Sequence, residues 1–219
     1  MKLNFRHIAA GPCLAGLRIS RALKSAPDGF RILIFHDIPD HAAPTFGRLV
    51  NEIVGSHGAI SPEQAADWLS GDPHRRPSPS WRAPYLFTFD DGFASNCGAA
   101  LDILNAHDIK ALFFVCPKLL DLSGSDQQNA IVKNIFQDRP PAALPAPLKL
   151  MSWDDVLALA ETGHSIGCHG MNHRRLAGLN DDDLSHEILD AADTLKHRTG
   201  RETPWFAYPF GDIESIDPE

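Results

Sequence analysis

Five short apolar runs are separated by longer polar stretches along the chain, a pattern typical of buried strands joined by helices and loops. The runs are apolar throughout rather than alternating, which indicates strands of a parallel sheet covered on both faces. The predicted strands are Arg31–Phe35, Tyr85–Phe89, Ala111–Cys116, His164–Cys168 and Trp205–Tyr208.

Three segments between these runs carry apolar residues at helical spacing, namely Asn96–His107, Ser152–Thr162 and Asp181–Arg198. The last segment begins with three aspartates and ends in basic residues before Gly200, as the helix dipole and the cap preferences favour. Alternation of strands and helices predicts an α/β architecture.

Two segments are predicted to be irregular. Gly71–Pro84 is rich in proline and is predicted to be a loop. Ser123–Pro147 is polar in its first part and rich in proline in its second. The second segment is expected to be an insertion with one short helix near Ile131–Phe136.

The composition fits one substantial domain. The chain has 219 residues, of which 43% are hydrophobic, in the usual range for a globular core. The formal charge of −8 and the isoelectric point of about 5.7 argue against a nucleic-acid-binding protein, which would be expected to show a basic face.

The N-terminal residues 1–25 are expected to be an extension that precedes a domain over 26–219. Glycine and proline interrupt the apolar stretch Ile8–Leu17, so it does not make a convincing signal peptide. No apolar run reaches the roughly 20 residues of a membrane span.

Two adjacent aspartates, Asp90 and Asp91, stand where the second apolar run meets Gly92. Because side chains alternate along a strand, the two carboxylates are expected to point in different directions, one towards a metal and one towards substrate or water. A cation would also help to keep both groups ionised. Asp-Gly is a common turn as well, so the pair alone leaves a plain turn open.

Two histidines, His169 and His173, follow the fourth apolar run. Four-residue spacing places two imidazoles on the same side of a helical turn, where they can share a metal ion. With one aspartate they would supply three protein ligands and leave positions for water, which is the pattern of a catalytic rather than a structural metal site. The alternative is that His173, which precedes two arginines, is a solvated surface residue.

Two other strand ends carry candidate residues. The segment Phe206–Gly211 ends in an aromatic turn that suits the face of a sugar ring, and a backbone N–H there could stabilise an oxyanion. Its alternative is a plain Pro-Gly turn. His36 leaves the first apolar run and is either a proton donor or a strand-end histidine held by Asp37.

Taken together and in this order, these segments resemble the motifs of the polysaccharide deacetylases of the NodB-homology family, carbohydrate esterase family four. Thr88–Gly92 matches the first motif, His169–His173 matches the metal-binding second motif, and Ala207–Gly211 resembles the third. The resemblance extends from about Arg31 to Gly211. It implies a distorted (β/α) barrel of the NodB-homology type.

The resemblance also implies roles for the matching residues. Asp91, His169 and His173 would bind a divalent metal, with Zn²⁺ as the first choice and Co²⁺ or Ni²⁺ as alternatives. Asp90 would be the catalytic base.

The third motif would form the groove. The backbone N–H of Phe210 would bind the oxyanion, and Tyr208 and Phe210, with Pro209 between them, would shape the substrate site.

The sequence departs from the family pattern at three points. Gly170 stands where Ser or Thr is usual, and Ala207 stands where the third motif often has an arginine that orients the catalytic aspartate. The chain also ends eight residues after Gly211, where most members continue to a further histidine that acts as general acid.

A circularly permuted branch of the family accounts for the last departure. In the branch that includes the poly-N-acetylglucosamine deacetylases of biofilm operons, a segment like Ile34–Ile38 precedes the first motif and supplies the acid. An alanine-type third motif also fits that branch, so the resemblance implies His36 as the general acid. A complete barrel would need one or two more strand-helix units of roughly 30 residues, so we expect a barrel that is incomplete at its C-terminal end, as in a fragment.

The expected activity is metal-dependent removal of N-acetyl groups from a polysaccharide that contains N-acetylhexosamine, with release of acetate. An O-acetyl esterase or another amide hydrolase with the same metal site is one alternative, and an inactive carbohydrate-binding homologue is another. The expected partner is an N-acetylated oligo- or polysaccharide, in the cytoplasm or the envelope of a bacterium.

Overall fold

The computed structural model of the chain describes residues 29–72, 82–138, 148–212 and 214–215. The predicted N-terminal extension, residues 1–25, lies outside these residues. So do residues 73–81 of the predicted loop and residues 139–147 of the predicted insertion.

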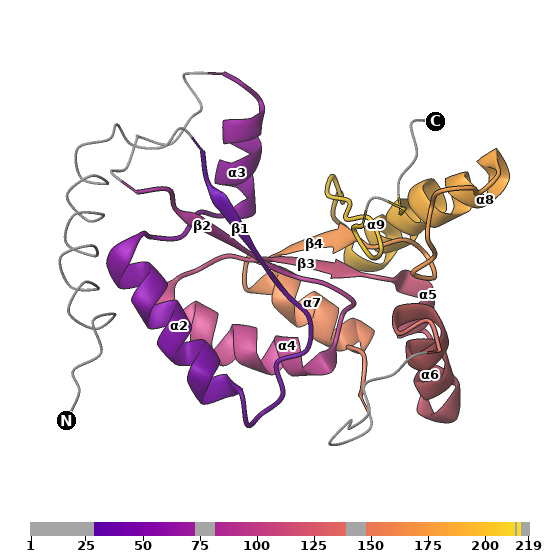
Figure 1. Cartoon of the computed structure of the whole chain (residues 1–219), viewed down its shortest axis with the longest axis horizontal. Coiled ribbons are helices and arrows are strands. Elements are labelled where there is room, and N and C mark those ends of the chain that lie inside the picture. Colours follow the sequence, from indigo (N-terminus) through magenta and orange to yellow (C-terminus); the bar gives the residue numbers. More distant parts are fainter. Residues whose placement is uncertain (1–28, 73–81, 139–147, 213, 216–219) are drawn as a thin grey trace, which may run out of the picture.

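Four parallel strands form one sheet at the centre of the molecule, in the order β1-β2-β3-β4 (Figure 1). They are β1 (Arg31–Phe35), β2 (Tyr85–Phe89), β3 (Leu112–Val115) and β4 (Ser165–Cys168). Each strand therefore pairs with its neighbour in the sequence, and the connections between them carry helices. The predicted α/β class is confirmed, and in the described part of the chain β1 and β4 stand at the two ends of the strand order.

The fifth apolar run forms less structure than predicted. Only Phe206 makes a bridge, to Cys168 at the end of β4. Two hydrogen bonds flank it, from the Cys168 N–H to the Trp205 carbonyl (2.8 Å) and from the Ala207 N–H to the Cys168 carbonyl (2.9 Å). Pro209 lies two residues after Ala207, at the next donor position, and has no N–H with which to continue this ladder.

The first run is also less buried than predicted. Ile32 and Ile34 share one face of this edge strand and are 55% and 60% exposed. The other face packs on the core, where the ring of Phe35 stacks on that of Phe89.

Helices connect all the strands. They are α2 (Ala43–Ser56), α3 (Pro62–Leu69), α4 (Ala94–Ala99), α5 (Pro117–Leu120), α6 (Gly124–Ala130), α7 (Trp153–Glu161), α8 (Asp181–Ser185) and α9 (Ala191–Thr199). Three π-helical segments continue α4, α6 and α8, namely η1 (Ala100–Leu104), η3 (Ile131–Ile135) and η4 (His186–Asp190), and the 3-10 turn η2 (Asn105–His107) follows η1. As drawn in Figure 1, α2, α4 and α7 lie below the strands and α3 lies above them.

The predicted helices begin and end at the expected signals. Ser152 caps α7 in a reciprocal pair with Asp155, and Gly200 ends α9 in the left-handed region (φ +68°). The insertion contains a longer helix than predicted, because α6 and η3 together run from Gly124 to Ile135.

The core is an aromatic layer between the strands and the helices. Phe87, Phe89 and Phe113 are almost completely buried, and the rings of Phe89 and Phe113 stack with centroids 4.6 Å apart. These side chains fix the positions of β2 and β3, from which the loops at the carboxyl ends of the strands extend.

One buried histidine at the opposite ends of the strands should make stability depend on pH. The Nδ1 atom of His164 accepts the Ala111 N–H (3.0 Å), and burial lowers the pKa of this imidazole to about 4. The unfolded chain, with an ordinary pKa of about 6.5, binds the extra proton first, so stability falls as the pH drops from about 6.5 to about 4. Between pH 7 and pH 4.5 this should cost roughly 2 kcal/mol of unfolding free energy.

Denaturant unfolding at the two pH values tests this expectation. His164→Asn is the matched variant, because its amide oxygen can accept the same N–H and does not titrate. Its stability should fall less over this pH range than that of the natural protein. An equal fall in both proteins would contradict the assignment.

Candidate metal centre

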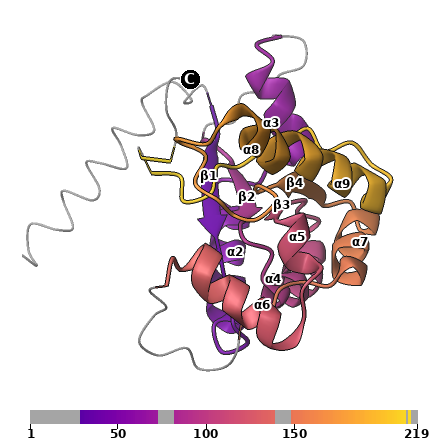
Figure 2. The same cartoon turned by 90° about the vertical axis from the view of Figure 1, so that its right-hand side faces the viewer.

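The sequence-predicted site residues gather at the carboxyl ends of the strands. Asp90 and Asp91 follow β2, His169 follows β4, and His36 follows β1. The strands are parallel, so these ends share one edge of the sheet. Figure 2, which faces the right-hand side of Figure 1, looks towards that edge, with α5 and α6 beside it.

The turn after β2 sets the direction of the two aspartates. The Asp90 N–H still donates to the Phe35 carbonyl (2.9 Å), whereas Asp91 (φ +70°) and Gly92 (φ +74°) are both left-handed. A Cβ atom on Gly92 would also lie 3.1 Å from Val115 Cγ1, so this position needs glycine for its conformation and for its space. The Asp91 side chain is thereby turned inwards and buried.

Asp91, His169 and His173 form a compact and buried group. The Asp91 Oδ1 atom lies 3.1 Å from His173 Nε2 and 3.5 Å from His169 Nε2. One possible ligand atom from each of the three residues lies within 4.8 Å of the others. The alternative that His173 is a surface residue is wrong, since only 4% of it is exposed.

The second ring nitrogen of each histidine is bound by a backbone carbonyl. His169 Nδ1 contacts the Ala207 carbonyl (2.9 Å), and His173 Nδ1 contacts the Asn134 carbonyl (3.0 Å). A carbonyl only accepts, so we assign a proton to Nδ1 in both rings, and Nε2 is the atom that contacts Asp91 and could bind a metal. Two imidazole nitrogens, each oriented by an outer contact, and one carboxylate fit a catalytic zinc-type site.

The conformation of the histidine loop differs from the helical turn that the four-residue spacing suggested. Residues 169–173 are not helical, and both Gly170 (φ +78°) and His173 (φ +58°) are left-handed. A non-glycine residue in this region is uncommon and indicates a conformation held by its surroundings. The two rings still meet, with centroids 4.8 Å apart.

The electrostatics separate the two aspartates. Burial disfavours the Asp91 carboxylate, but hydrogen bonds from His169 and His173 outweigh it and hold the pKa of Asp91 well below its usual range. Burial raises the pKa of Asp90, and the negative charge of Asp91 adds to this effect. The Asp91 carboxyl group is therefore ionised, which suits a metal ligand. The Asp90 carboxylate has the higher pKa and binds a proton more readily.

A cavity of about 550 Å³ opens onto this group, a size typical of ligand sites. Asp91 and His173 line it together with His36 and Phe210, which come from different strand ends. The Phe210 ring packs edge-on against the His173 ring with centroids 4.6 Å apart. Tyr208 is 45% exposed and contacts Phe206, and Pro209 is buried; both lie outside the lining of this cavity.

Several residues of the cavity were not predicted from the sequence. Arg175 forms a bidentate ion pair with Asp212 and stacks its guanidinium over the Phe210 ring, 4.9 Å from the centroid. The apolar wall includes Phe93 and Phe136. An arginine shortly after the second histidine was visible in the sequence, but nothing local indicated that it would reach the third motif.

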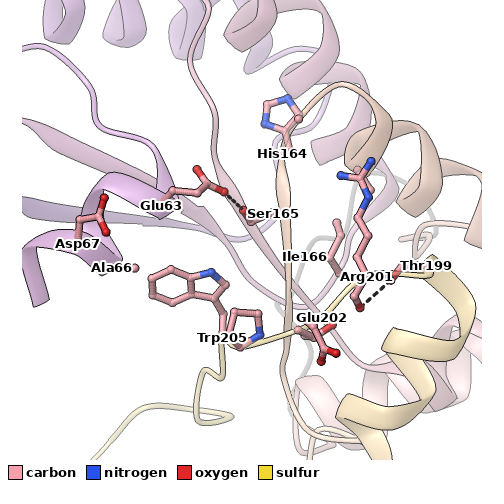
Figure 3. Close-up of a pocket in the computed structure, with 14 residues that line it drawn as sticks. Glu63, Ala66, Asp67, His164, Ser165, Ile166, Thr199, Arg201, Glu202 and Trp205 are labelled. Carbon is pink, nitrogen blue, oxygen red and sulfur yellow. Dashed lines mark hydrogen bonds between the residues drawn. The ribbon is translucent and has the colours of Figure 1, made fainter. Parts of the chain in front are cut away.

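A second cavity, of about 450 Å³, lies at the opposite end of β4 (Figure 3). Figure 3 shows Glu63 and Asp67 of α3 on one side and Thr199 and Arg201 on the other, with Glu63 accepting a hydrogen bond from Ser165 (3.0 Å). None of the sequence-predicted site residues lines this cavity, so the chemistry is assigned to the first one.

The strands form a parallel sheet and are connected by helices, and an Asp-His-His group lies at the carboxyl ends of the strands. The molecule is therefore an α/β protein with a candidate metal centre. The sequence model of the family described as polysaccharide deacetylase matches residues 81–216, which is more than half of the chain. The chain therefore belongs to the polysaccharide deacetylase family, and the family resemblance predicted from the motifs is confirmed.

Individual relatives agree with this family. The chain is 25% identical over 147 residues to a peptidoglycan-N-acetylglucosamine deacetylase of Bacillus cereus, an alignment that covers 67% of this chain and 43% of that protein. It is also 25% identical over 171 residues to an uncharacterized 30.6 kDa protein of Geobacillus stearothermophilus, covering 78% of this chain and 48% of that one. The chain thus spans about half the length of the curated relatives it matches.

Solved structures share the fold. IcaB from Ammonifex degensii superposes with a TM-score of 0.63 at 20% identity, covering 86% of this chain and 78% of that one. The deacetylase domain of BpsB from Bordetella bronchiseptica gives 0.60 at 18% identity, covering 88% and 85%. Within the described residues, no helix combines the length and the apolar character that crossing a membrane requires.

Proposed function

We propose that the protein is a metal-dependent deacetylase that removes N-acetyl groups from an N-acetylhexosamine polysaccharide and releases acetate. The observation that supports this most is the convergence of Asp91, His169 and His173 in one buried group, of which Asp91 and His173 line a cavity that His36 also lines. Membership of the polysaccharide deacetylase family favours the same substrate class.

Asp91, His169 and His173 are the residues that would hold the metal. Their oxygen and nitrogen donors and the three-ligand pattern favour Zn²⁺, with Co²⁺ and Ni²⁺ as alternatives. Bound there, a divalent cation supplies electrophilic assistance to a carbonyl oxygen and lowers the pKa of water.

The side chains of this chain account for the proton transfers. Asp90 takes a proton from the attacking water, and the backbone N–H of Phe210 donates to the oxygen that becomes negative. His36 gives a proton to the departing nitrogen as the carbon–nitrogen bond breaks. Amide and water are thereby converted into acetic acid and an amine, which leave as acetate and ammonium at neutral pH, while the proton on Asp90 is lost to solvent and His36 regains one.

The proposal is tested by assaying acetate release from N-acetylglucosamine oligomers, with and without added Zn²⁺. Release that stops after chelation and returns with the metal is the expected result. An acetyl ester assayed in parallel distinguishes an O-acetyl esterase, and binding of oligomers without any release would identify an inactive carbohydrate-binding homologue.

Replacing His36 with glutamine should lower kcat on the amide substrate by about 10²- to 10⁴-fold, the usual contribution of a general acid. An aryl acetate should be affected far less, because its leaving group departs without protonation. Steady-state kinetics on both substrates check this expectation.

His41→Gln is the matched control, since this exposed histidine follows the same strand and does not line the cavity. An equal loss on both substrates, or no loss on either, would rule out His36 as the acid.

A further inference from the structure

The loop that carries the two histidines is held by a buried glutamate outside the predicted motifs. Glu187 lies in η4 and is 0% exposed. Its Oε2 atom accepts the Asn172 N–H (3.0 Å), and its Oε1 atom accepts the Asn172 side-chain amide (3.0 Å). Both carboxylate oxygens are thus used on the residue that directly precedes His173.

The same asparagine is held from a second side. Asn134 of η3 donates its side-chain amide to the Asn172 carbonyl (2.9 Å), and its own carbonyl contacts His173 Nδ1 (3.0 Å). Asn172 therefore lies between two π-helical segments, each of which supplies one polar residue. Such segments are rare in helices and are frequent at functional sites.

These contacts coincide with an unusual backbone. His173 has φ +58° and Gly170 has φ +78°, so the loop turns left-handed at both positions. A left-handed non-glycine residue is strained and persists only where the surroundings determine it. The hydrogen bonds that link Asn172 to Glu187 and Asn134 supply such surroundings at the residue next to His173.

Glu187 also accounts for the departure at Gly170. A Cβ atom on Gly170 would lie 2.9 Å from Glu187 Oε2 and 3.5 Å from Pro209 Cγ. The carboxylate occupies the space that a serine or threonine side chain would need. At this position the loop is stabilised by a group from a distant helix rather than by its own hydroxyl.

We propose that Glu187 is a positioning residue, which fixes Asn172 and thereby holds His173 in the orientation that directs its Nε2 at the metal. The inference rests on the proposed metal site but makes no use of the reaction itself. Glu187 does not line the cavity, and its two hydrogen bonds go to Asn172.

Glu187→Gln tests the proposal with metal binding as the readout. A glutamine has one acceptor oxygen in place of two, so its amide NH₂ would face one of the two donors of Asn172. We expect the affinity for Zn²⁺, titrated against a chromophoric chelator, to fall by about 10- to 100-fold, as for other groups that orient a ligand. The visible spectrum of the Co²⁺ form should change as well, because the geometry of one histidine ligand is altered.

Two further variants complete the test. Glu161→Gln, an exposed glutamate at the end of α7, is the matched control and should bind both metals like the natural protein. Asn172→Ala removes one of the two donors and leaves Glu187 in place, so it should weaken Zn²⁺ binding by a smaller factor. It also carries the test if Glu187→Gln does not fold.

Folded Glu187→Gln or Asn172→Ala protein with natural Zn²⁺ affinity and an unchanged Co²⁺ spectrum would overturn the proposal. Because the readout needs no turnover, it is separable from the proposed function. A natural protein that binds Zn²⁺ tightly but releases no acetate would refute the deacetylase activity, and the loss of affinity in Glu187→Gln would still support the positioning role.

Discussion

Asp91→Asn is expected to abolish metal binding and, with it, acetate release. Its Oδ1 atom lies between the two histidine Nε2 atoms, at 3.1 and 3.5 Å, and it is the carboxylate of this buried group. Asparagine keeps the shape of the side chain but removes the charge that offsets a buried divalent cation. Metal assistance is worth several kcal/mol, and each 1.36 kcal/mol is a factor of ten, so kcat/KM should fall by at least about 10³-fold.

Bound Zn²⁺ and released acetate are measured on the same protein samples. Asp108→Asn is the matched control, because Asp108 is an exposed aspartate in the same left-handed conformation (φ +52°), which asparagine tolerates well. It should retain both metal and activity. A folded Asp91→Asn protein with natural metal content would remove Asp91 from the ligand set and with it the proposed mechanism.

The sequence predicts the sheet well because each strand is a continuous apolar run. The first four predicted runs all contain a strand, and the residues singled out at their carboxyl ends meet at one edge of the sheet. This success has a physical origin, since the carboxyl ends of parallel strands must lie side by side. A local pattern at each strand end therefore predicts a shared site.

The helices between β1 and β2 were not predicted from the sequence, and in α2 the local residue composition explains why. In α2 the core-facing residues Phe46, Val50 and Ile53 do follow helical spacing, but Gly47 and Gly55 within the segment weaken the local preference for a helix. Packing of the apolar face against the core stabilises the helix despite these glycines. The propensities of single residues do not include this tertiary packing.

The contacts that orient the histidines could not be predicted. Glu187 is fourteen residues beyond His173 and Asn134 is thirty-nine before it, and neither belongs to a recognisable motif. The left-handed conformation of His173 is equally hidden, because it is set by these distant contacts rather than by the residue itself. The motifs name the ligands, whereas the tertiary structure determines their geometry.

Asp90→Asn is expected to leave metal binding intact and to lower kcat by about 10²- to 10⁴-fold, the usual contribution of a general base. Asp90 is outside the three-residue metal group, and burial beside Asp91 raises the pKa of its carboxyl group, which makes it a better proton acceptor than an exposed aspartate. Asparagine is nearly isosteric but cannot accept the proton. Zn²⁺ content and steady-state kinetics on an N-acetylglucosamine oligomer check both parts.

A double variant with His36→Gln sharpens this test. If Asp90 and His36 serve successive proton transfers of one reaction, the double variant should be far less impaired than the product of the two single losses, because each change already disables the same pathway. Multiplicative losses would show that the two residues contribute independently rather than as one unit. Loss of metal from Asp90→Asn would instead make Asp90 a ligand, and the division of labour between the two adjacent aspartates would be wrong.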